Sequence, residues 1–379
     1  MMTRLGDVCT VISGSTPKTS VAEYWDGDIK WITPAELNED SFYLYDSQRH
    51  ITELGKEKTG LSYMPIGTVI LSSRAPIGKT AIAGCEMCCN QGFKNLICSD
   101  DIFNEYLYYF LKGKTDYLNS LGRGATFKEI SKSIVENIEI RLPALEEQKQ
   151  IARQFGEIYR LISLRKQQLA KLDELVKARF VELFGATSAD KCSKQIKDYA
   201  EVLGGYAFKS DMFCTNAVPV IRISNINNGC VDPDYDVCYD ELFWEQNKRF
   251  RAEQNDILMA MSGATTGKAG LYKEDMPALI NQRVACIRAK DGIACPMFLF
   301  VATQLEWMYD LIQETSAGCA QPNISGKQIE NMPVPDATYE QQQQFAAFVE
   351  QTDKSKLAIQ QSLDKLETLK RSLMQKYFG

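Results

Sequence analysis

The chain has 379 residues, of which 45% are hydrophobic and 24% charged, a balance that suits two or three globular domains and excludes a disordered or fibrous protein. It contains no stretch of about 18 apolar residues and no N-terminal basic segment followed by an apolar run, so we expect a cytoplasmic protein without a membrane partner. The formal charge of −6 disfavours indiscriminate nucleic-acid binding, and the 12 scattered cysteines disfavour a disulfide scaffold.

Residues 1–145 are rich in β-branched and aromatic residues, punctuated by glycine, proline and asparagine. This composition predicts a mixed α/β globule, with a strand at Thr68–Leu71 and an amphipathic helix at Glu105–Lys112. Residues 146–185 then run as far as Phe184 without a proline and with one internal glycine, Gly156. They are predicted to form a long helix.

The second half of the chain repeats this order. Residues 186–338 predict another mixed α/β globule, with a strand at Asp256–Met259 and a helix at Met297–Gln313. Residues 339–379 contain no proline and no glycine before the last residue, so they predict a second long helix. A helix of about 39 residues is roughly 58 Å long.

Both predicted long helices carry an apolar stripe at steps of three and four residues, which is the spacing of helices that pack on each other. Simple packing and a partner-binding surface both remain open for this stripe. Its members are Leu169, Leu172, Val176 and Leu183 in the first helix, and Leu363, Leu366 and Leu373 in the second.

The chain is a tandem repeat of two similar units. Matching residues recur at nearly constant offsets, 191 residues near the start and 194 residues from Ile130 to Gly185. The matches include Leu5, Asp7, Val11 and Gly14 with Ile196, Asp198, Val202 and Gly205, Trp31-Ile32-Thr33 with Arg222-Ile223-Ser224, and Ser73–Lys79 with Ser262–Lys268. Such duplication over about 180 residues indicates two related modules rather than a chance of composition.

Two variable globules that alternate with two similar long helices resemble the specificity subunits of type I restriction-modification systems, and the resemblance covers the whole chain. Short motifs that occur in both units, in the order typical of the family, strengthen the resemblance. They are Gly78-Lys79-Thr80 with Gly267-Lys268-Ala269, Asn90-Gln91-Gly92-Phe93 with Asn281-Gln282-Arg283-Val284, the segments 124–131 and 318–325, and Glu147-Gln148 with Glu340-Gln341.

The resemblance implies an α+β fold in which two similar mixed α/β target-recognition domains, 1–145 and 186–338, are separated by two long spacer helices, 146–185 and 339–379. The helices are expected to pack as an antiparallel coiled coil around a pseudo-twofold axis. Each domain is expected to read one half of a bipartite, interrupted sequence in double-stranded DNA. The helices would set the gap and dock two adenine methyltransferase subunits, which motor-nuclease subunits can join. S-adenosylmethionine, ATP and magnesium are expected on those partners, and no cofactor is expected on this chain.

Three groups of loop residues are candidates for contacting DNA, because glycine, hydroxyl, amide and cationic groups suit phosphates and base edges. A plain turn is the alternative for the first group. Residues shared by both units, as in the second group, favour fold support or phosphate contact over base readout. The groups are Arg74, Lys79 and Thr80 with Thr265, Thr266 and Lys268; Asn90, Gln91 and Lys94 with Asn281, Gln282 and Arg283; and Arg123, Thr126 and Lys128 with Gln321, Asn323 and Lys327; Arg222 is a further candidate.

Signatures of catalysis are missing from the sequence. The Gly78-Lys79-Thr80 motif is not a P-loop, because Ser73 stands where that loop needs a glycine. His50 is the only histidine and has no counterpart in the second unit, and the cysteines at 85, 88, 89 and 98 also lack one, which disfavours a zinc site. We therefore expect no catalytic or metal site. A non-catalytic scaffold that binds proteins through its paired helices is the alternative function.

Overall fold

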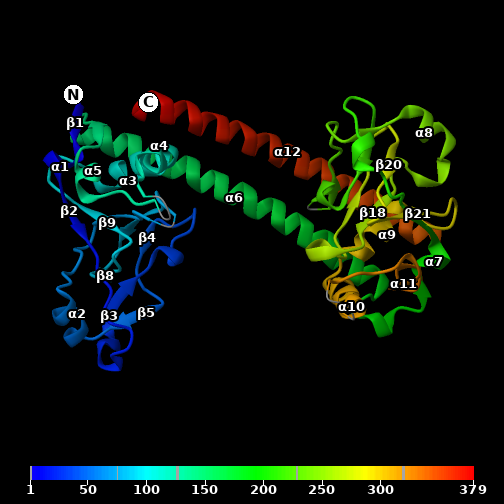
Figure 1. The fold of residues 1–379 in the computed structure, drawn as a ribbon, viewed down its shortest axis with the longest axis horizontal. Helices are drawn as coiled ribbons and strands as arrows, with labels where there is room; N and C mark the ends of the chain where they lie inside the picture. The colour runs from blue at the N-terminus through cyan, green and yellow to red at the C-terminus, as the bar shows by residue number, and fades with distance from the viewer. Residues whose placement is uncertain (1, 75, 125–127, 228, 318–320) are drawn as a thin grey trace. The chain divides into compact units, whose positions relative to one another are not determined.

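The computed structural model describes residues 2–74, 76–124, 128–227, 229–317 and 321–379. These residues form two compact units (Figure 1). Unit 1 comprises Met1–Arg165 with Ser362–Gly379, and unit 2 comprises Lys166–Gln361. Among the described residues, no helix combines the length and the apolar character needed to cross a membrane.

Unit 1 is built on a five-stranded sheet in the order β2-β9-β6-β7-β4 and a three-stranded sheet in the order β5-β3-β8. A short antiparallel pair, β1 with β10, joins the start of the unit to the segment before its long helix. The strands are β1 (Met2–Arg4), β2 (Cys9–Ser13), β3 (Trp25–Ile32), β4 (Tyr43–Leu44), β5 (Arg49–Ile51), β6 (Val69–Leu71), β7 (Thr80–Ala83), β8 (Cys88–Cys89), β9 (Lys94–Cys98) and β10 (Glu139–Arg141).

The helices of unit 1 close the core on one side of this sheet. The helix α3 packs against β6 and β7, and its residues from Tyr106 to Leu111 are all buried, which explains why this segment is apolar on most of its faces. Helix α3 confirms the predicted helix at Glu105–Lys112. The short helices of the unit are α1 (Leu5–Val8), α2 (Glu53–Thr59), α3 (Asn104–Gly113), α4 (Thr115–Leu121) and α5 (Lys132–Glu136).

Unit 2 repeats this plan, with a six-stranded sheet in the order β12-β21-β18-β19-β15-β14 and a four-stranded sheet in the order β16-β13-β20-β17. Its first four strands correspond one to one to β2-β9-β6-β7 of unit 1, which confirms the tandem repeat. The strands of the two sheets are β12 (Ala200–Gly204), β13 (Val218–Ile221), β14 (Ile226–Asn227), β15 (Cys230–Val231), β16 (Cys238–Tyr239), β17 (Arg251–Ala252), β18 (Ile257–Ala260), β19 (Ala269–Leu271), β20 (Ala278–Ile280) and β21 (Val284–Ala289), and β11 (Lys194–Gln195) pairs with β22 (Pro333–Val334).

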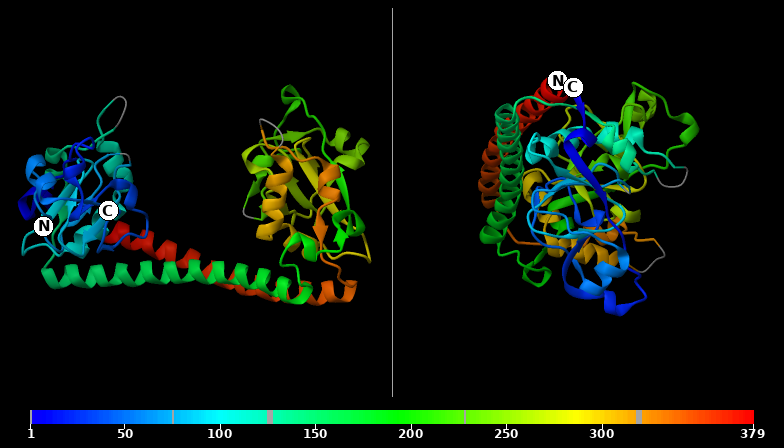
Figure 2. Two further views of the ribbon diagram at one scale, coloured as in Figure 1. Left: turned by 90° about the horizontal axis from the view of Figure 1, so that it is seen from below. Right: turned by 90° about the vertical axis from the view of Figure 1, so that its left-hand side faces the viewer.

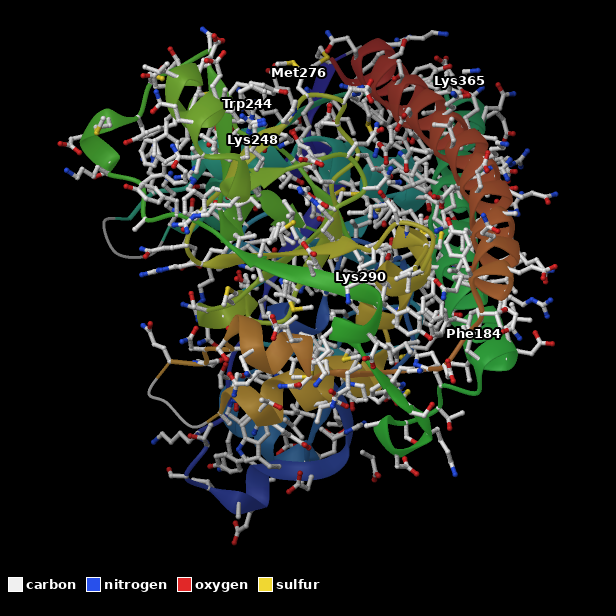
Figure 3. The ribbon with its side chains drawn as sticks, turned by 90° about the vertical axis from the view of Figure 1, so that its right-hand side faces the viewer. Phe184, Trp244, Lys248, Met276, Lys290 and Lys365 are labelled. Carbon is white, nitrogen blue, oxygen red and sulfur yellow. The ribbon has the colours of Figure 1, made fainter. Side chains whose placement is uncertain are left out.

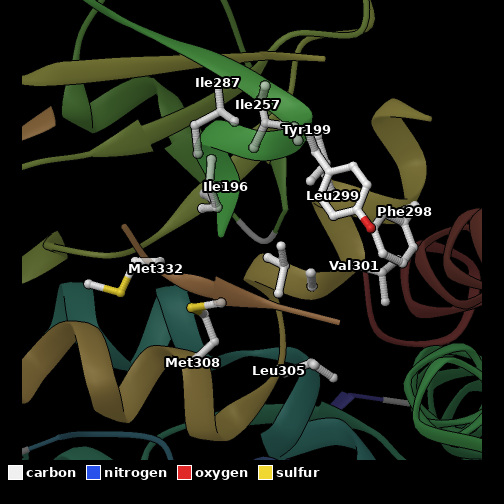
Figure 4. Close-up of a cluster of buried hydrophobic side chains, with 14 of the residues drawn as sticks. Ile196, Tyr199, Ile257, Ile287, Phe298, Leu299, Val301, Leu305, Met308 and Met332 are labelled. Carbon is white, nitrogen blue, oxygen red and sulfur yellow. The ribbon is translucent and has the colours of Figure 1, made fainter. Parts of the chain in front are cut away.

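The core of unit 2 lies between its six-stranded sheet and its helices. Figure 4 shows Ile257 and Ile287 from the sheet facing Tyr199 and Phe298, with Met308 below them. The single helix predicted at Met297–Gln313 is wrong, because the structure breaks it at Gln304–Leu305 so that the Leu305 side chain enters the core. The short helices are α7 (Ile196–Tyr199), α8 (Glu241–Gln246), α9 (Pro296–Thr303), α10 (Glu306–Ser316) and α11 (Gly326–Glu330).

The two long helices predicted from the sequence are confirmed as α6 (Leu145–Phe184) and α12 (Tyr339–Phe378), each of 40 residues. In unit 1, Phe155 stacks on Phe378 with ring centroids 5.5 Å apart, while four residues later the Tyr159 ring meets the Lys370 ammonium. The two helices therefore pack antiparallel in this unit (Figure 2).

The same antiparallel direction holds in unit 2. Lys356 Nζ lies 2.7 Å from the Asp173 carboxylate, and Phe180 packs edge-on against Phe345 at 5.2 Å. Of the predicted stripe, Val176 and Leu363 are buried and Leu169, Leu172, Leu366 and Leu373 are half-buried. Leu183 is 39% exposed and does not belong to the seam, because at this end of α6 Phe180 and Phe184 turn toward Phe298 of the globule.

The structure also corrects the register of the repeat at two places. Asn90 N donates to Ile32 O at 3.0 Å, and Asn281 N donates to Ile221 O at the same distance, so Trp31-Ile32-Thr33 corresponds to 220–222 and not to 222–224. The loop after the β6 or β18 strand is one residue longer in unit 2. Ser72 N bonds Lys79 O in unit 1, whereas the equivalent bond in unit 2 joins Ala260 N to Lys268 O.

Candidate nucleic-acid interface

Three loops of unit 1 that are far apart in the sequence meet where strands β6, β7 and β9 end on one side of the five-stranded sheet. The 72–79 loop joins β6 to β7, the 90–93 loop leads into β9, and the 122–130 segment follows α4. Ser73 holds them together, because its N–H donates to Gly92 O at 2.7 Å and its carbonyl accepts from Ile130 N at 3.0 Å. The three candidate groups proposed from the sequence of unit 1 are thus brought into one cluster.

A carboxylate that the sequence did not single out lies at the centre of this cluster. Glu129 Oε1 is 3.2 Å from Lys94 Nζ, and Glu129 Oε2 is 4.0 Å from Arg74 Nη1. Lys94 is buried and also reaches Ser73 Oγ at 3.4 Å, whereas the Arg74 side chain is 36% exposed. The buried cation is therefore committed to Glu129, and the exposed cation is held loosely.

The corresponding loops of unit 2 form the same cluster. Met261 occupies the place of Ser73, since its N–H donates to Arg283 O at 2.8 Å and its carbonyl accepts from Ile324 N at 2.9 Å. The backbone bridge between Arg74 and Glu129 recurs between Ser262 and Asn323. The two units therefore share a frame of three loops whose side chains differ.

Several predicted DNA-binding residues instead make hydrogen bonds within the protein. Lys79 Nζ donates to Pro34 O at 3.2 Å and to Leu37 O at 2.5 Å, so its ammonium caps a turn rather than facing solvent. Thr80 is buried within β7, where its hydroxyl donates to the Gly78 carbonyl. Thr266 is likewise buried and donates to the carbonyls of Gly263 and Pro322.

Two asparagines also have a local structural role. Asn90 Oδ1 accepts from Gly92 N at 2.8 Å, and Asn281 Oδ1 accepts from Arg283 N at 3.2 Å, a short-range turn made by side chains of this type. These bonds favour a structural role, rather than base recognition, for asparagines that both units share. Arg222 is paired with Asp234 at 3.0 Å.

Most of the remaining candidates have exposed side chains, although Gln91 Oε1 also accepts a hydrogen bond from the Thr16 hydroxyl. Exposed residues of the three loops of unit 1 are Gln91, Arg123 and Lys128, and those of unit 2 are Lys268, Gln282, Arg283, Gln321 and Asn323, with Lys327 just after them in α11. Thr126 lies outside the described residues. Arg123 and Glu129 line one hollow of about 520 Å³ beside α4. Exposed amides and cations at a common edge are suited to reaching phosphates and base edges.

Two hydroxyls of unit 2 differ from these exposed groups. Ser262 Oγ and Thr265 Oγ1 are covered by protein atoms, yet neither has a hydrogen-bond partner among the described residues. Both lie in the loop that matches the 72–79 loop of unit 1. Thr265 is thus a candidate that the structure leaves with unused donor capacity.

The second sheet of unit 2 carries cations that the sequence reasoning missed. Lys248 and Arg249 are exposed in the turn before β17, and Figure 3 shows Lys248 close to Trp244 and well apart from Phe184 of the long helix. The guanidinium of Arg251 lies 3.8 Å from the centre of the Trp244 ring, and Arg49 covers Trp25 in unit 1 at 3.7 Å. Three cations within residues 248–251 were the available signal in the sequence.

The cysteine cluster does not converge on a point. Cys88 packs in the core around Trp25 and Trp31, while Cys89 faces the core around Phe93, because neighbouring residues of a strand point to opposite sides. Burial raises the pKa of the Cys88 thiol to about 11. Among the described residues, no group of three or more histidine, cysteine or acidic side chains is placed to hold a metal ion.

Comparison with known proteins points to one family. The family model for the type I restriction modification DNA specificity domain matches residues 1–174 and again 190–371. The MjaIX specificity subunit of Methanocaldococcus jannaschii is 33% identical over 290 residues, which cover 70% of this chain and 67% of the relative. The MjaVIII specificity subunit of the same organism is 25% identical over 393 residues, covering 98% and 90%.

Solved structures share the fold. A type I restriction-modification S subunit from M. genitalium matches with a TM-score of 0.59 at 14% identity, covering 100% of this chain and 96% of that one. A chain solved for the complex assembly and conformational transition of the type I R-M system matches with a TM-score of 0.62 at 16% identity, covering 100% and 97%.

Proposed function

The chain belongs to the family of type I restriction-modification DNA specificity subunits, and from this membership we propose that its two units each read one half of an interrupted DNA target. Members of this family recognise DNA sequence and leave catalysis to partner subunits, so the chain is a non-catalytic DNA-recognition subunit. The proposal adds to this the bipartite target, the division of labour between the units and the choice of partners.

The duplicated cluster of three loops is the observation that carries the proposal. In each unit the same backbone frame presents a different set of exposed amides and cations, from Arg123 and Lys128 in unit 1 to Arg283 and Asn323 in unit 2. A shared frame with different side chains is what two related readers of unlike half-sites require, because base edges are distinguished by side-chain donors and acceptors. We assign residues 1–145 and 186–338 to the two recognition domains.

The acidic charge of the chain is compatible with this role. With 43 basic and 49 acidic side chains, the protein has no general attraction for phosphates, so contact has to come from local cations such as Lys128 and Lys268. The acidic remainder limits binding to arbitrary DNA. Sequence preference then rests on geometry rather than on bulk charge.

The long helices at 146–185 and 339–379 are assigned to spacing and assembly. They would fix the gap between the half-sites and dock two adenine methyltransferase subunits, to which motor-nuclease subunits can be added. S-adenosylmethionine, ATP and magnesium would be bound by those partners. A solved chain of the same fold was studied for the complex assembly of the type I R-M system, which supports the proposal that this chain joins such a complex.

Exchange of one unit tests the proposal. Residues 190–335 are replaced by the matching segment of a related specificity subunit, and the methylated sequence is mapped in cells that also carry the methyltransferase partner. We expect one half of the target to change while the other half is kept. A change in both halves would refute independent readers, and loss of any DNA preference with intact assembly would favour the scaffold function.

A further inference from the structure

The ion-pair cluster formed by Arg74, Lys94 and Glu129 in unit 1 has no charged counterpart in unit 2. The positions of Arg74, Lys94 and Glu129 correspond to Ser262, Ala285 and Asn323 through equivalent backbone pairings. Three charges in one unit are thus replaced together by three neutral side chains in the other. The shared loop frame does not depend on the charges, since it forms in both units.

Glu129 is an unexpected residue at an edge that faces DNA, because a carboxylate repels phosphates. Its side chain is 40% exposed and lines the same hollow as Arg123. Lys94, at 3.2 Å and with a side chain only 10% exposed, cannot leave the carboxylate without stranding a buried charge. Arg74, at 4.0 Å and 36% exposed, can leave it at little cost.

We propose that Glu129 is a specificity-determining positioning residue of unit 1, which withholds the Arg74 guanidinium from arbitrary phosphates and releases it only to a correctly placed DNA acceptor. Lys94 remains as the permanent counter-ion, so that the carboxylate stays neutralised after Arg74 moves. Unit 2 has no such control, because Asn323 and Ser262 carry no charge. This inference rests on the proposed function of unit 1 as a half-site reader.

The test uses the complete complex of this chain with its methyltransferase partner and two fluorescent duplexes, one with the full target and one with the unit 1 half-site scrambled. Dissociation constants are measured by anisotropy over a series of KCl concentrations. For Glu129→Gln we expect about 2- to 5-fold tighter binding to the scrambled duplex at low salt, the range for an exposed ion pair. The slope of log K against log[salt] should become steeper by about 0.9, the value for one added phosphate contact.

A second substitution separates release of Arg74 from a general effect of charge. In Glu129→Gln/Arg74→Gln the gain on the scrambled duplex should disappear. Glu129→Asp, which keeps the negative charge, should bind the scrambled duplex as the wild type does. Glu136→Gln in α5 removes the same charge from an ion pair with Lys132 outside the loops, and it should leave the salt slope unchanged.

Each outcome decides the question. An unchanged affinity and slope for Glu129→Gln, or a gain that persists without Arg74, would overturn the inference. If Glu129→Gln fails to fold because Lys94 is left unpaired, Glu129→Gln/Lys94→Met removes the stranded charge and carries the same expectation. A wild-type complex that binds both duplexes equally would instead contradict the proposed function.

Discussion

Gln148 and Gln342, 194 residues apart, make the same three hydrogen bonds at the start of the two long helices, so Gln148 corresponds to Gln342 and not to Gln341, with which the sequence motif pairs it. Gln148 Oε1 accepts from Phe103 N at 2.8 Å, and its amide donates to the carbonyls of Asp101 and Pro143. Gln342 Oε1 accepts from Cys295 N at 2.8 Å, and its amide donates to the carbonyls of Ile293 and Ala337. Both side chains are fully buried, so each joins a long helix to the globule that it follows.

Truncating either glutamine should destabilise its own unit. Gln148→Ala removes the partner of the Phe103 N–H and of the Asp101 and Pro143 carbonyls, groups that are only partly shielded from water, and is expected to cost about 1–3 kcal/mol of unfolding free energy. Urea unfolding of the chain followed by circular dichroism measures the loss. Gln150→Ala, at an exposed position of the same helix turn, is the matched control and should be neutral. Equal stabilities of the two variants would contradict the role of Gln148 in joining the long helix to the globule.

The paired lysines Lys79 and Lys268 should behave differently although the repeat aligns them. Lys79→Ala removes the cap on the Pro34 and Leu37 carbonyls and should destabilise unit 1 by about 1–3 kcal/mol, with little change in the salt dependence of DNA binding. Lys268→Ala, at an exposed position, should leave stability unchanged and reduce the salt slope by about 1. The reverse pattern would show that Lys79 is the phosphate contact.

The half-buried Lys112 amine should stabilise unit 1 in mild alkali relative to a variant that lacks it. It donates to Glu39 O at 2.6 Å and to the Tyr108 hydroxyl at 2.7 Å, and burial, with nearby Lys370 adding to it, lowers the pKa of Lys112 to about 8. In the unfolded chain this pKa returns to about 10.4, so between pH 8 and 10 Lys112 binds more protons in the unfolded state, and its contribution to stability rises with pH.

Urea unfolding at pH 7 and pH 9.5 tests the direction in which Lys112 changes stability with pH. The wild type should gain about 1–2 kcal/mol relative to Lys112→Met over this interval, because the variant lacks the titrating group. The comparison with the variant cancels the opposing titration of buried thiols and tyrosines, such as Cys88 and Tyr159, whose pKa values burial raises to about 11 and about 12. A wild type that loses stability relative to the variant would show that Lys112 is held in its charged form.

Shortening one long helix should change the gap and not the half-sites. Removing seven residues from the middle of α6 takes out two helical turns, about 10 Å, while keeping the apolar seam in phase. The methylated sequence should then show an altered spacing between unchanged halves, or assembly with the methyltransferase should be lost. An active complex with the original gap would count against the spacer role.

Much of the architecture could be predicted because its signals are periodic or duplicated. The absence of proline from residues 146–184 and 339–378 sufficed for the long helices, and matching residues such as Gly14 and Gly205 showed the repeat. The same repeat identified the right loops, because turn residues such as Gly78 and Gly267 recur in both copies.

The fate of individual side chains in those loops could not be predicted from the same signals. Lys79, Lys94 and Lys128 look alike in sequence, but one caps carbonyls, one is buried against Glu129 and one is exposed. These differences depend on elements such as the turn at Pro34–Leu37 that are distant along the chain. The break before α10 is of the same kind, because the packing of Leu305 overrides the local helical preference.

Mapping methylated adenines in the DNA of cells that carry this chain with its methyltransferase partner tests most directly whether the two units read separate half-sites. We predict one interrupted target, made of two unlike half-sites at a fixed separation, with an adenine methylated in each half. A single continuous target or methylation without any sequence preference would contradict the claim that the two units read DNA separately, and two identical halves would contradict the claim that they read unlike half-sites.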